Sequence, residues 1–215
     1  MIYIFINLWY NKFMEDNNTN IKPDWAINKD AQIVDSQFSE ITIDKSEYDK
    51  IWVISDTHFC HRRILEYEAE NRPFKDRDEM NEALIQRWNE KVGKEDLVLH
   101  LGDFSFGNKH RIKDIVARLN GRIWLLLGNH DREQHYNWQE LGFERVIKCP
   151  YLLDNKFVFS HEPLETIPDG LVNIYGHVHG SKYFNTKDDN RLCACVERWN
   201  CAPIEYDYIK GLFGI

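Results

Sequence analysis

The chain has 215 residues, which fits one domain of ordinary size, and 43% of them are hydrophobic. That share, together with an aromatic content of 13%, excludes a disordered chain. The formal net charge of -8 argues against a protein that binds the backbone of a nucleic-acid polymer, because such binding needs a cationic surface.

Cysteine usage and the first residues bear on the compartment. Five cysteines are an odd number and too sparse for a disulfide framework, so free thiols in a reducing cytoplasm are the simplest account. The apolar run of residues 1–10 is too short to span a bilayer and lacks the basic start and cleavage site of a secretory signal. We therefore expect a cytoplasmic protein that does not bind a membrane.

Residues 1–50 are expected to form an N-terminal extension that contains one or two edge strands, near residues 32–34 and 41–43. They carry no recognisable chemistry, and they would either cover the functional site or build a homodimer. Residues 51–215 contain no low-complexity linker, so we expect a single domain there.

Three apolar runs between residues 51 and 127 predict buried strands. They span residues 51–55, 97–101 and 122–127, and each ends at polar residues. Amphipathic stretches at residues 76–92 and 109–119 predict helices, and Gly93 provides a stop signal for the first of them. The repeat of strand, polar residues and helix predicts an α/β sheet whose ligand residues lie at the strand ends.

The C-terminal third is predicted to be mostly strands. A short helix near residues 134–141 is followed by strand signals at residues 146–149, 151–153, 157–160 and 171–175. Asp154-Asn155, between two apolar runs, predicts a hairpin turn. Residues 192–199 and 203–206 predict a last hairpin at the edge of a sheet.

The sequence Gly176-His177-Val178-His179-Gly180 follows the strand signal at residues 171–175. On an extended segment, two histidines one residue apart point to opposite faces, so one metal ion does not easily bind both. The flanking glycines let the backbone turn tightly without a clash from Cβ. Each imidazole can therefore reach a different ion of a metal pair.

Four further blocks of ligand-type residues follow strand signals earlier in the chain. They are Asp56-Thr57-His58, Gly102-Asp103, Gly128-Asn129-His130-Asp131 and His161. A carboxylate and an imidazole two residues apart in a loop can turn toward one ion. Mixed oxygen and nitrogen ligation of this kind suits Mn, Fe or Zn better than Ca. We expect two divalent ions, with Mn favoured and Fe, Zn or Ni as alternatives.

In this order the blocks resemble the calcineurin-like metallophosphoesterases, whose pattern is D-x-H, GD, GNH(D/E), H and GHxH. The resemblance covers roughly residues 50–205. It implies an α/β fold, a four-layer αββα sandwich of two mixed β-sheets flanked by helices, with two metal ions at the sheet ends. The first block and Trp88-Asn89 resemble a compact, uncapped bacterial and phage-type branch of the family.

The resemblance also implies the ligands, as two groups of three residues and one carboxylate that both ions share. The first group is Asp56, His58 and His179, the second is Asn129, His161 and His177, and the shared carboxylate is Asp103. A bridging carboxylate holds two dications about 3.5 to 4 Å apart, and a water shared between them ionises near neutral pH. The resulting hydroxide would attack phosphorus in line.

His130 is expected to act beside the ions rather than on them. By resemblance it approaches the leaving-group oxygen, to which it donates a proton or whose developing charge it stabilises. Asp131 would orient His130 or pair with a nearby base. His61 and Arg62 follow the first block closely and would bind the phosphate or the leaving group.

One departure concerns the substrate class. Phosphoprotein phosphatases of this superfamily carry an Asp and an Arg soon after the GD, whereas here Phe104-Ser105-Phe106-Gly107 follows. Without that phosphate-clamping arginine, and by resemblance to uncapped members, we expect a phosphodiesterase that acts on a small or nucleotide-derived ester. The alternatives are a nuclease of the same superfamily, which should have a basic groove, and a non-catalytic scaffold with this fold, which would tend to lose ligands.

The remaining histidines and cysteines are expected to be structural. His100, inside a predicted strand, should be packed, and His110 and His135 should lie on the surface. Cys193 and Cys195 are interpreted as small residues on a strand rather than a thiolate metal site, because no second pair of the structural zinc kind is present.

Overall fold

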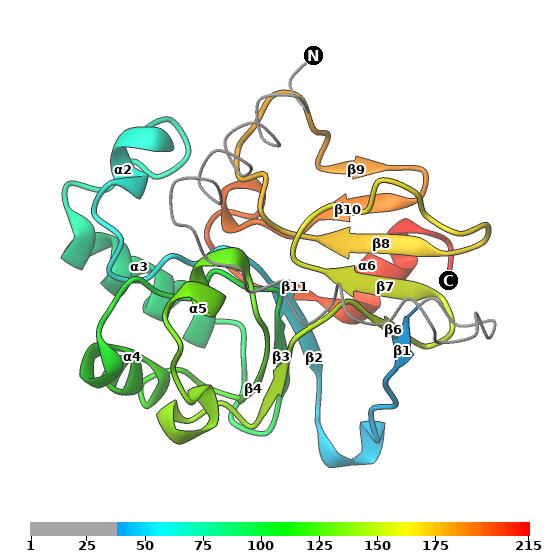
Figure 1. Ribbon diagram of the computed structural model, residues 1–215, viewed down its shortest axis with the longest axis horizontal. Helices are drawn as coiled ribbons and strands as arrows, with labels where there is room; N and C mark the ends of the chain where they lie inside the picture. Colours follow the sequence, from blue (N-terminus) through cyan, green and yellow to red (C-terminus); the bar gives the residue numbers. More distant parts are fainter. Residues whose placement is uncertain (1–37) are drawn as a thin grey trace, which may run out of the picture. The chain divides into compact units, whose positions relative to one another are not determined.

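Within residues 38–215, which are those the structure describes, two β-sheets form the centre of the computed structural model (Figure 1). One sheet has five strands and the other six. The apolar run of residues 1–10 and the strand expected near residues 32–34 lie outside the described residues.

The five-stranded sheet is built from the strands that the apolar runs predicted. Its order is β11 (Ile204–Glu205), β2 (Ile51–Ile54), β3 (Leu97–His100), β4 (Arg122–Leu126) and β5 (Arg145–Ile147). Strands β2 to β5 are parallel, and only β11 is antiparallel to its neighbour. Because parallel strands are covered on both faces, their sequences are continuous apolar runs rather than alternating ones.

The six-stranded sheet mixes parallel and antiparallel pairs. Its order is β1 (Ser39–Glu40), β6 (Tyr151–Leu153), β7 (Phe157–Ser160), β8 (Val172–Tyr175), β10 (Arg191–Cys193) and β9 (Lys187–Asp188). The predicted hairpin between β6 and β7 is confirmed, and its turn residues Asp154 and Asn155 have φ values of +53° and +49°. Two consecutive positive φ values are the geometry of a type I′ turn.

Two hydrophobic cores set the order of the layers. Val53, Leu99 and Leu126 of the five-stranded sheet belong to the same buried cluster as Phe159 and Ile174 of the six-stranded sheet. On the other face of the five-stranded sheet, a second cluster includes side chains of α3 (Arg77–Asn89) and α4 (Lys109–Val116). Two mixed sheets flanked by helices, as the resemblance implied, are therefore confirmed.

The two predicted helices begin where expected, at side-chain caps, but end earlier than expected. Asp76 accepts the backbone N–H groups of Asp78 and Glu79 at 3.0 and 2.9 Å and starts α3. Asn108 caps α4 in the same way, through the N–H of Arg111 at 3.0 Å. The prediction that Gly93 stops the first helix is wrong, because the helix has already ended at Asn89.

Two segments were predicted wrongly. No α-helix forms over residues 134–141: α5 (Asn129–Glu133) precedes them and starts directly at the Gly-Asn-His block, and only a 3-10 turn, η3 (Trp138–Leu141), lies within them. The last hairpin does not form, because β10 and β11 lie in different sheets and the chain crosses between them through η4 (Val196–Arg198). The alternating apolar residues of this segment are buried, but its two strands do not pair with each other.

The remaining elements are short or terminal. They are η2 (Lys45–Glu47), α2 (Ile64–Tyr67) and α6 (Tyr206–Leu212), a C-terminal helix that was not predicted. None of the helices in the described part of the chain is long and apolar enough to cross a membrane.

Candidate metal centre

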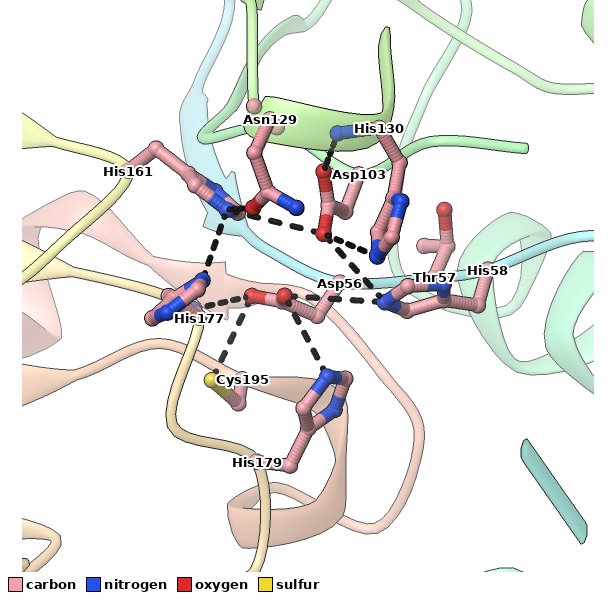
Figure 2. A network of polar contacts seen from close by, with 12 residues as sticks. Asp56, Thr57, His58, Asp103, Asn129, His130, His161, His177, His179 and Cys195 are labelled. Atoms are coloured by element: carbon pink, nitrogen blue, oxygen red, sulfur yellow. Dashed lines mark hydrogen bonds and ion pairs between the residues drawn. The ribbon is translucent and has the colours of Figure 1, made fainter. Parts of the chain in front are cut away.

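The ligand-type residues meet where strands of both sheets end (Figure 2). Strands β2, β3 and β4 lead to Asp56, Asp103 and Asn129, while β7 and β8 lead to His161 and the two histidines of the GHVHG segment. Carboxyl ends of parallel strands gather ligand-binding loops. Here two such edges, one from each sheet, supply one cluster.

The first ligand group is Asp56, His58 and His179, whose candidate ligand atoms lie within 4.8 Å of one another. The Oδ1 atom of Asp56 lies 3.8 Å from Nε2 of His58 and 3.7 Å from Nε2 of His179. Asp56 Oδ1 and both ring nitrogens of His58 are buried and have no hydrogen-bond partner. Buried polar atoms are nearly always paired, so Asp56 Oδ1 and His58 Nε2, which face one another, fit a site in which a cation is the missing partner.

The second group is Asp103, His161 and His177, with the same spacing of ligand atoms. Asp103 Oδ2 lies 3.5 Å from Nε2 of His161 and 3.6 Å from Nε2 of His58, so this oxygen is between the two groups. Asn129 Oδ1 joins the second group at 2.9 Å from Nε2 of His161. The carboxylate expected to be shared does face both groups.

The donor set fits divalent ions. It contains imidazole nitrogens, an amide oxygen and the carboxylates of Asp56 and Asp103, which are 0% and 2% exposed. The buried carboxylates of Asp56 and Asp103 need compensating positive charge, because taking charges out of water costs several kcal/mol each.

The backbone at these ligands is strained. Asp56, His58, Asp103, His177 and His179 have φ values of +58°, +49°, +55°, +70° and +47°. Residues other than glycine adopt this left-handed region uncommonly, at about 1–3 kcal/mol each when strained, and such residues cluster at functional sites. The two histidines of GHVHG therefore lie in a turn after β8 rather than on the strand itself.

The glycines of the motifs allow the backbone to approach the carboxylates. A Cβ atom at Gly128 would collide with the carboxylate of Asp103, and one at Gly176 would collide with Asp56 and Ser55. In the space thus left, the backbone N–H of His177 donates to Asp56 Oδ2 at 2.8 Å. Gly102 adds a φ of +106°, which turns the chain directly before Asp103.

A buried ion pair behind the first group was not predicted. Glu197 Oε1 accepts from Nδ1 of His179 at 3.0 Å, which leaves Nε2 to face Asp56. Arg72 pairs with the same oxygen at 2.6 Å and also donates to the backbone carbonyl of Thr57 at 2.9 Å. Arg72 and Glu197 are 125 positions apart in a region without a recognisable motif, so no sequence signal linked them.

In the second group, a hydrogen bond to the backbone likewise orients His161. His161 Nδ1 lies 2.9 Å from the carbonyl oxygen of Leu101, which can only accept a hydrogen bond. Nδ1 therefore carries a proton, and Nε2, which faces Asp103, is the ring nitrogen that an ion would bind.

The electrostatics agree with a cation site. Burial opposes the charged form of His161, but the hydrogen bond and charge of Asp103 outweigh it and raise the pKa of His161 to about 9. Burial likewise opposes charge on His179, whose pKa Glu197 and Asp56 raise to about 9. For Asp103, burial is outweighed by His161, which lowers its pKa to about 2. The carboxylates thus draw positive charge into the cluster.

Asp131 has a structural position. It is fully buried, and its two oxygens accept the backbone N–H groups of Asp103, Phe104 and Gly128 at 2.7, 3.0 and 3.0 Å. Burial, with Asp103 nearby, raises the pKa of Asp131 to about 7. Both oxygens are engaged by the backbone, so we assign Asp131 to holding together the loops after β3 and β4 rather than to orienting His130.

His130 lies at the opening of the cluster. Its side chain is 34% exposed, and its Nε2 atom is 4.0 Å from Asp103 Oδ2. His61 is half-buried beside it and stacks on Phe106, with ring centroids 3.9 Å apart. Arg62 is exposed, and no contact among the described residues joins its side chain to either ligand group.

The other histidines and the cysteines lie as expected. His100 is buried, with Nε2 3.0 Å from Thr57 Oγ1, whereas His110 and His135 are exposed. The five cysteines are free. Cys195 adds one contact that its spacing gave no reason to expect, a hydrogen bond from Sγ to Asp56 Oδ2 at 3.3 Å.

Comparisons with known proteins agree with this geometry. The family profile of the calcineurin-like phosphoesterases matches residues 49–203. Uncharacterized protein MJ1445 of Methanocaldococcus jannaschii is 33% identical over 173 residues, which cover 76% of this chain and 90% of that protein. The Gene 66 protein of Mycobacterium phage L5 is 28% identical over 163 residues, covering 60% and 76%.

A solved structure agrees as well. The crystal structure of AQ665, a protein of unknown function from Aquifex aeolicus, superposes with a TM-score of 0.61 at 28% identity and covers 76% of this chain and 98% of its own. From the order of the motifs, the two-sheet fold and the profile match over residues 49–203, the chain belongs to the calcineurin-like phosphoesterase family.

Proposed function

We propose that this protein is a metal-dependent phosphodiesterase that acts on a small or nucleotide-derived ester. The observation that carries the proposal is the meeting of the two ligand groups at Asp103, with unpartnered buried atoms on Asp56 and His58. Such a cluster has no evident structural purpose, because an apolar core would be more stable than unpaired polar atoms.

Two divalent ions, with Mn favoured, would supply Lewis-acid polarisation of the phosphoryl group and a water of lowered pKa. Asp56, His58 and His179 would hold one ion, and Asn129, His161 and His177 the other. Asp103 would bind both, since its Oδ2 faces His58 and His161 at 3.6 and 3.5 Å.

His130 would assist departure of the alcohol. Its imidazole is partly exposed at the opening of the cluster, with Nε2 4.0 Å from Asp103 Oδ2, so it could reach the leaving oxygen of an ester bound at the ligand groups. It would donate a proton to that oxygen or stabilise the charge that develops on it.

The preference for a diester is supported by the positions of the cationic side chains. Among the described residues, no Lys or Arg forms a hydrogen bond or ion pair with a side chain of either ligand group: Arg72 is buried and paired with Glu197, and Arg198 donates to the backbone carbonyl of His179. A monoester carries an additional negative charge, for which Arg is the usual bidentate partner. A singly charged diester needs no such partner beyond the ions.

The test is turnover of bis(p-nitrophenyl) phosphate and of p-nitrophenyl phosphate, with Mn, Ni, Zn or a chelator present. We expect metal-dependent turnover with the diester preferred. A strong preference for the monoester would contradict the substrate class alone. If a folded protein hydrolyses neither ester with any metal, the hydrolase proposal is wrong and a non-catalytic scaffold becomes the better reading. Strong loss of turnover of a DNA or RNA substrate with added salt would instead favour a nuclease.

A further inference from the structure

An exposed aromatic ring stands at the opening of the metal centre. Phe106 is 40% exposed, one of few large apolar side chains that the described residues leave in solvent. Its ring stacks on His61 at 3.9 Å and on His58 at 5.4 Å, and it meets His130 at 4.7 Å between ring centroids. It thus touches a ligand-group histidine and both histidines at the opening.

The loop that carries Phe106 is held by hydrogen bonds. The N–H of Phe106 donates to the carbonyl of Phe59 at 2.8 Å, and Ser105 Oγ donates to the same carbonyl at 3.0 Å. The neighbouring N–H of Gly107 donates to Ser105 Oγ at 2.9 Å. Because its backbone is hydrogen-bonded and its ring already stacks on His61, Phe106 has little freedom left for a ligand to remove, which favours binding.

A pocket adjoins the ring on the side of His130. Its volume is about 370 Å³, and it is lined by Phe106, Gly107, Asn108, His130, Gln134 and Tyr136. Pockets of about 300–1,000 Å³ are the size that holds small ligands, and aromatic side chains with a few polar groups are their usual lining. This one has two aromatic rings in addition to the imidazole.

One polar atom of the lining lacks a partner. Gln134 Nε2 donates to the carbonyl of Ser105, while its Oε1 is buried without a hydrogen-bond partner. A ligand that carries an N–H or O–H donor could satisfy this acceptor after a small shift of the amide.

We infer that this pocket binds the leaving group of the substrate, and that the leaving group is a nucleoside. The inference rests on the proposed function, because His130 is both the side chain expected to meet the leaving oxygen and a wall of the pocket. In the reaction, a water oxygen bonds to phosphorus and the bond from phosphorus to the nucleoside oxygen breaks. That oxygen takes a proton from His130, and a nucleoside and a phosphate monoester result. Every base presents a flat face that can stack on Phe106, with Tyr136 as a further aromatic wall of the pocket.

The test is internal competition within one substrate, adenosine 5′-(methyl phosphate), under the metal conditions that support turnover of bis(p-nitrophenyl) phosphate. Cleavage with adenosine in the pocket releases adenosine and methyl phosphate, whereas cleavage on the other side releases methanol and AMP. Chromatography of the products gives the ratio of adenosine to AMP. The ratio is independent of the fraction of enzyme that is folded or metal-loaded.

We expect adenosine to be the main product of the parent protein. Because stacking of one base on an aromatic side chain is worth about 5- to 150-fold, Phe106→Ala should lower the ratio by about that factor. Phe106→Tyr keeps the ring and should preserve the ratio. Tyr208→Ala removes a ring that is 55% exposed on α6, outside the pocket, and should also leave the ratio unchanged.

Two results would overturn the inference alone. They are AMP as the main product of the parent, and a ratio that Phe106→Ala leaves unchanged while the ester is still hydrolysed. Absence of turnover of both this ester and bis(p-nitrophenyl) phosphate would instead overturn the proposed function, and the inference with it.

Discussion

Two regions of the site differ in how they are built. The floor is the set of candidate metal ligands, which are Asp56, His58, Asp103, Asn129, His161, His177 and His179. The rim is the set of half-buried or exposed rings around the opening, which are those of His61, Phe106, His130 and Tyr136. Asp56 in the floor is 0% exposed and Phe106 in the rim is 40% exposed.

Five of the seven floor residues, which offer oxygen and nitrogen donors, have positive φ values, whereas none of the four rim residues, which present ring faces, does. Donors that face one another can serve any phosphate ester, but ring faces distinguish one alcohol from another. Substitutions in the floor should therefore affect all esters alike, and substitutions in the rim should change the ratio between esters.

The largest effect is expected in the floor, for Asp103→Asn. It keeps the shape of the side chain but removes the charge that both ions would share, so bound metal should fall from two ions toward one. Metal polarisation is worth several kcal/mol, so turnover of every ester should fall on the order of 10⁴-fold. Metal analysis and steady-state kinetics measure both.

Asp114→Asn is the matched control, because Asp114 is a carboxylate that is 56% exposed on α4 and contacts only His110 among the ion pairs of the described residues. It should leave metal content and turnover unchanged. An Asp103→Asn protein with full metal content and full turnover would refute the assignment of a shared carboxylate.

His130→Ala should have the next largest effect. Loss of a general acid costs about 10²- to 10⁴-fold in rate. Metal content should be retained, because the hydrogen bond to Asp103 Oδ1 at 3.0 Å comes from the backbone N–H of His130, which the variant keeps.

The dependence on the leaving group separates this role from a structural one. A p-nitrophenolate leaves without much protonation, so kcat should fall less for bis(p-nitrophenyl) phosphate than for a dialkyl ester. Equal losses for both esters would exclude His130 from the leaving oxygen.

A smaller effect on chemistry but a large one on stability is expected for Glu197→Gln. Substituting a residue that orients a metal ligand, as Glu197 would orient His179, typically lowers metal affinity by about 10- to 100-fold. Removing one partner of a buried ion pair costs about 3–5 kcal/mol of unfolding free energy, and both side chains of the Arg72–Glu197 pair are 0% exposed. Metal titration and urea unfolding test the two parts.

Glu82→Gln is the control for that variant. Glu82 and Arg118 form an exposed pair, with side chains 63% and 48% exposed, which should contribute less than about 1 kcal/mol. Equal destabilisation by Glu82→Gln and Glu197→Gln would show that the buried pair has no special importance for the floor.

The smallest effect is expected for Arg62→Ala. The sequence placed Arg62 near the phosphate, but the side chain is exposed and has no contact with the ligand groups among the described residues. Surface changes of this kind are worth within about 0.5 kcal/mol, or roughly twofold. A tenfold rise in KM in steady-state assays would restore Arg62 as a substrate-binding residue.

All of the floor residues were named from the sequence, whereas only the two histidines of the rim were, for a physical reason. Floor residues follow apolar strand signals directly, and the flanking glycines mark the places where the backbone meets a carboxylate, as Gly128 does at Asp103. The local spacing of residues along the sequence was therefore enough to predict which residues belong to the floor. Phe106 and Tyr136 come together with His130 only through the fold, and an aromatic residue in a loop has no spacing signal of its own.

The same distinction applies to the fold. Strands β2, β3 and β4 were predicted because each is one continuous apolar run, and α3 because its apolar residues recur at helical spacing. The crossing from β10 to β11 was misread as a hairpin, because alternation cannot tell which sheet a strand will join. Arg72 and Glu197 were missed because only tertiary contact across 125 positions gives their pairing a meaning.

The most direct test of the whole account is one titration. Chelator-treated protein is titrated with Mn²⁺, and bound ions and turnover of bis(p-nitrophenyl) phosphate are measured in the same samples. We predict that two ions bind per chain and that turnover rises with their occupancy, because two ligand groups meet at Asp103. Full turnover in a sample with no bound ion, or a folded protein that binds none, would contradict the account.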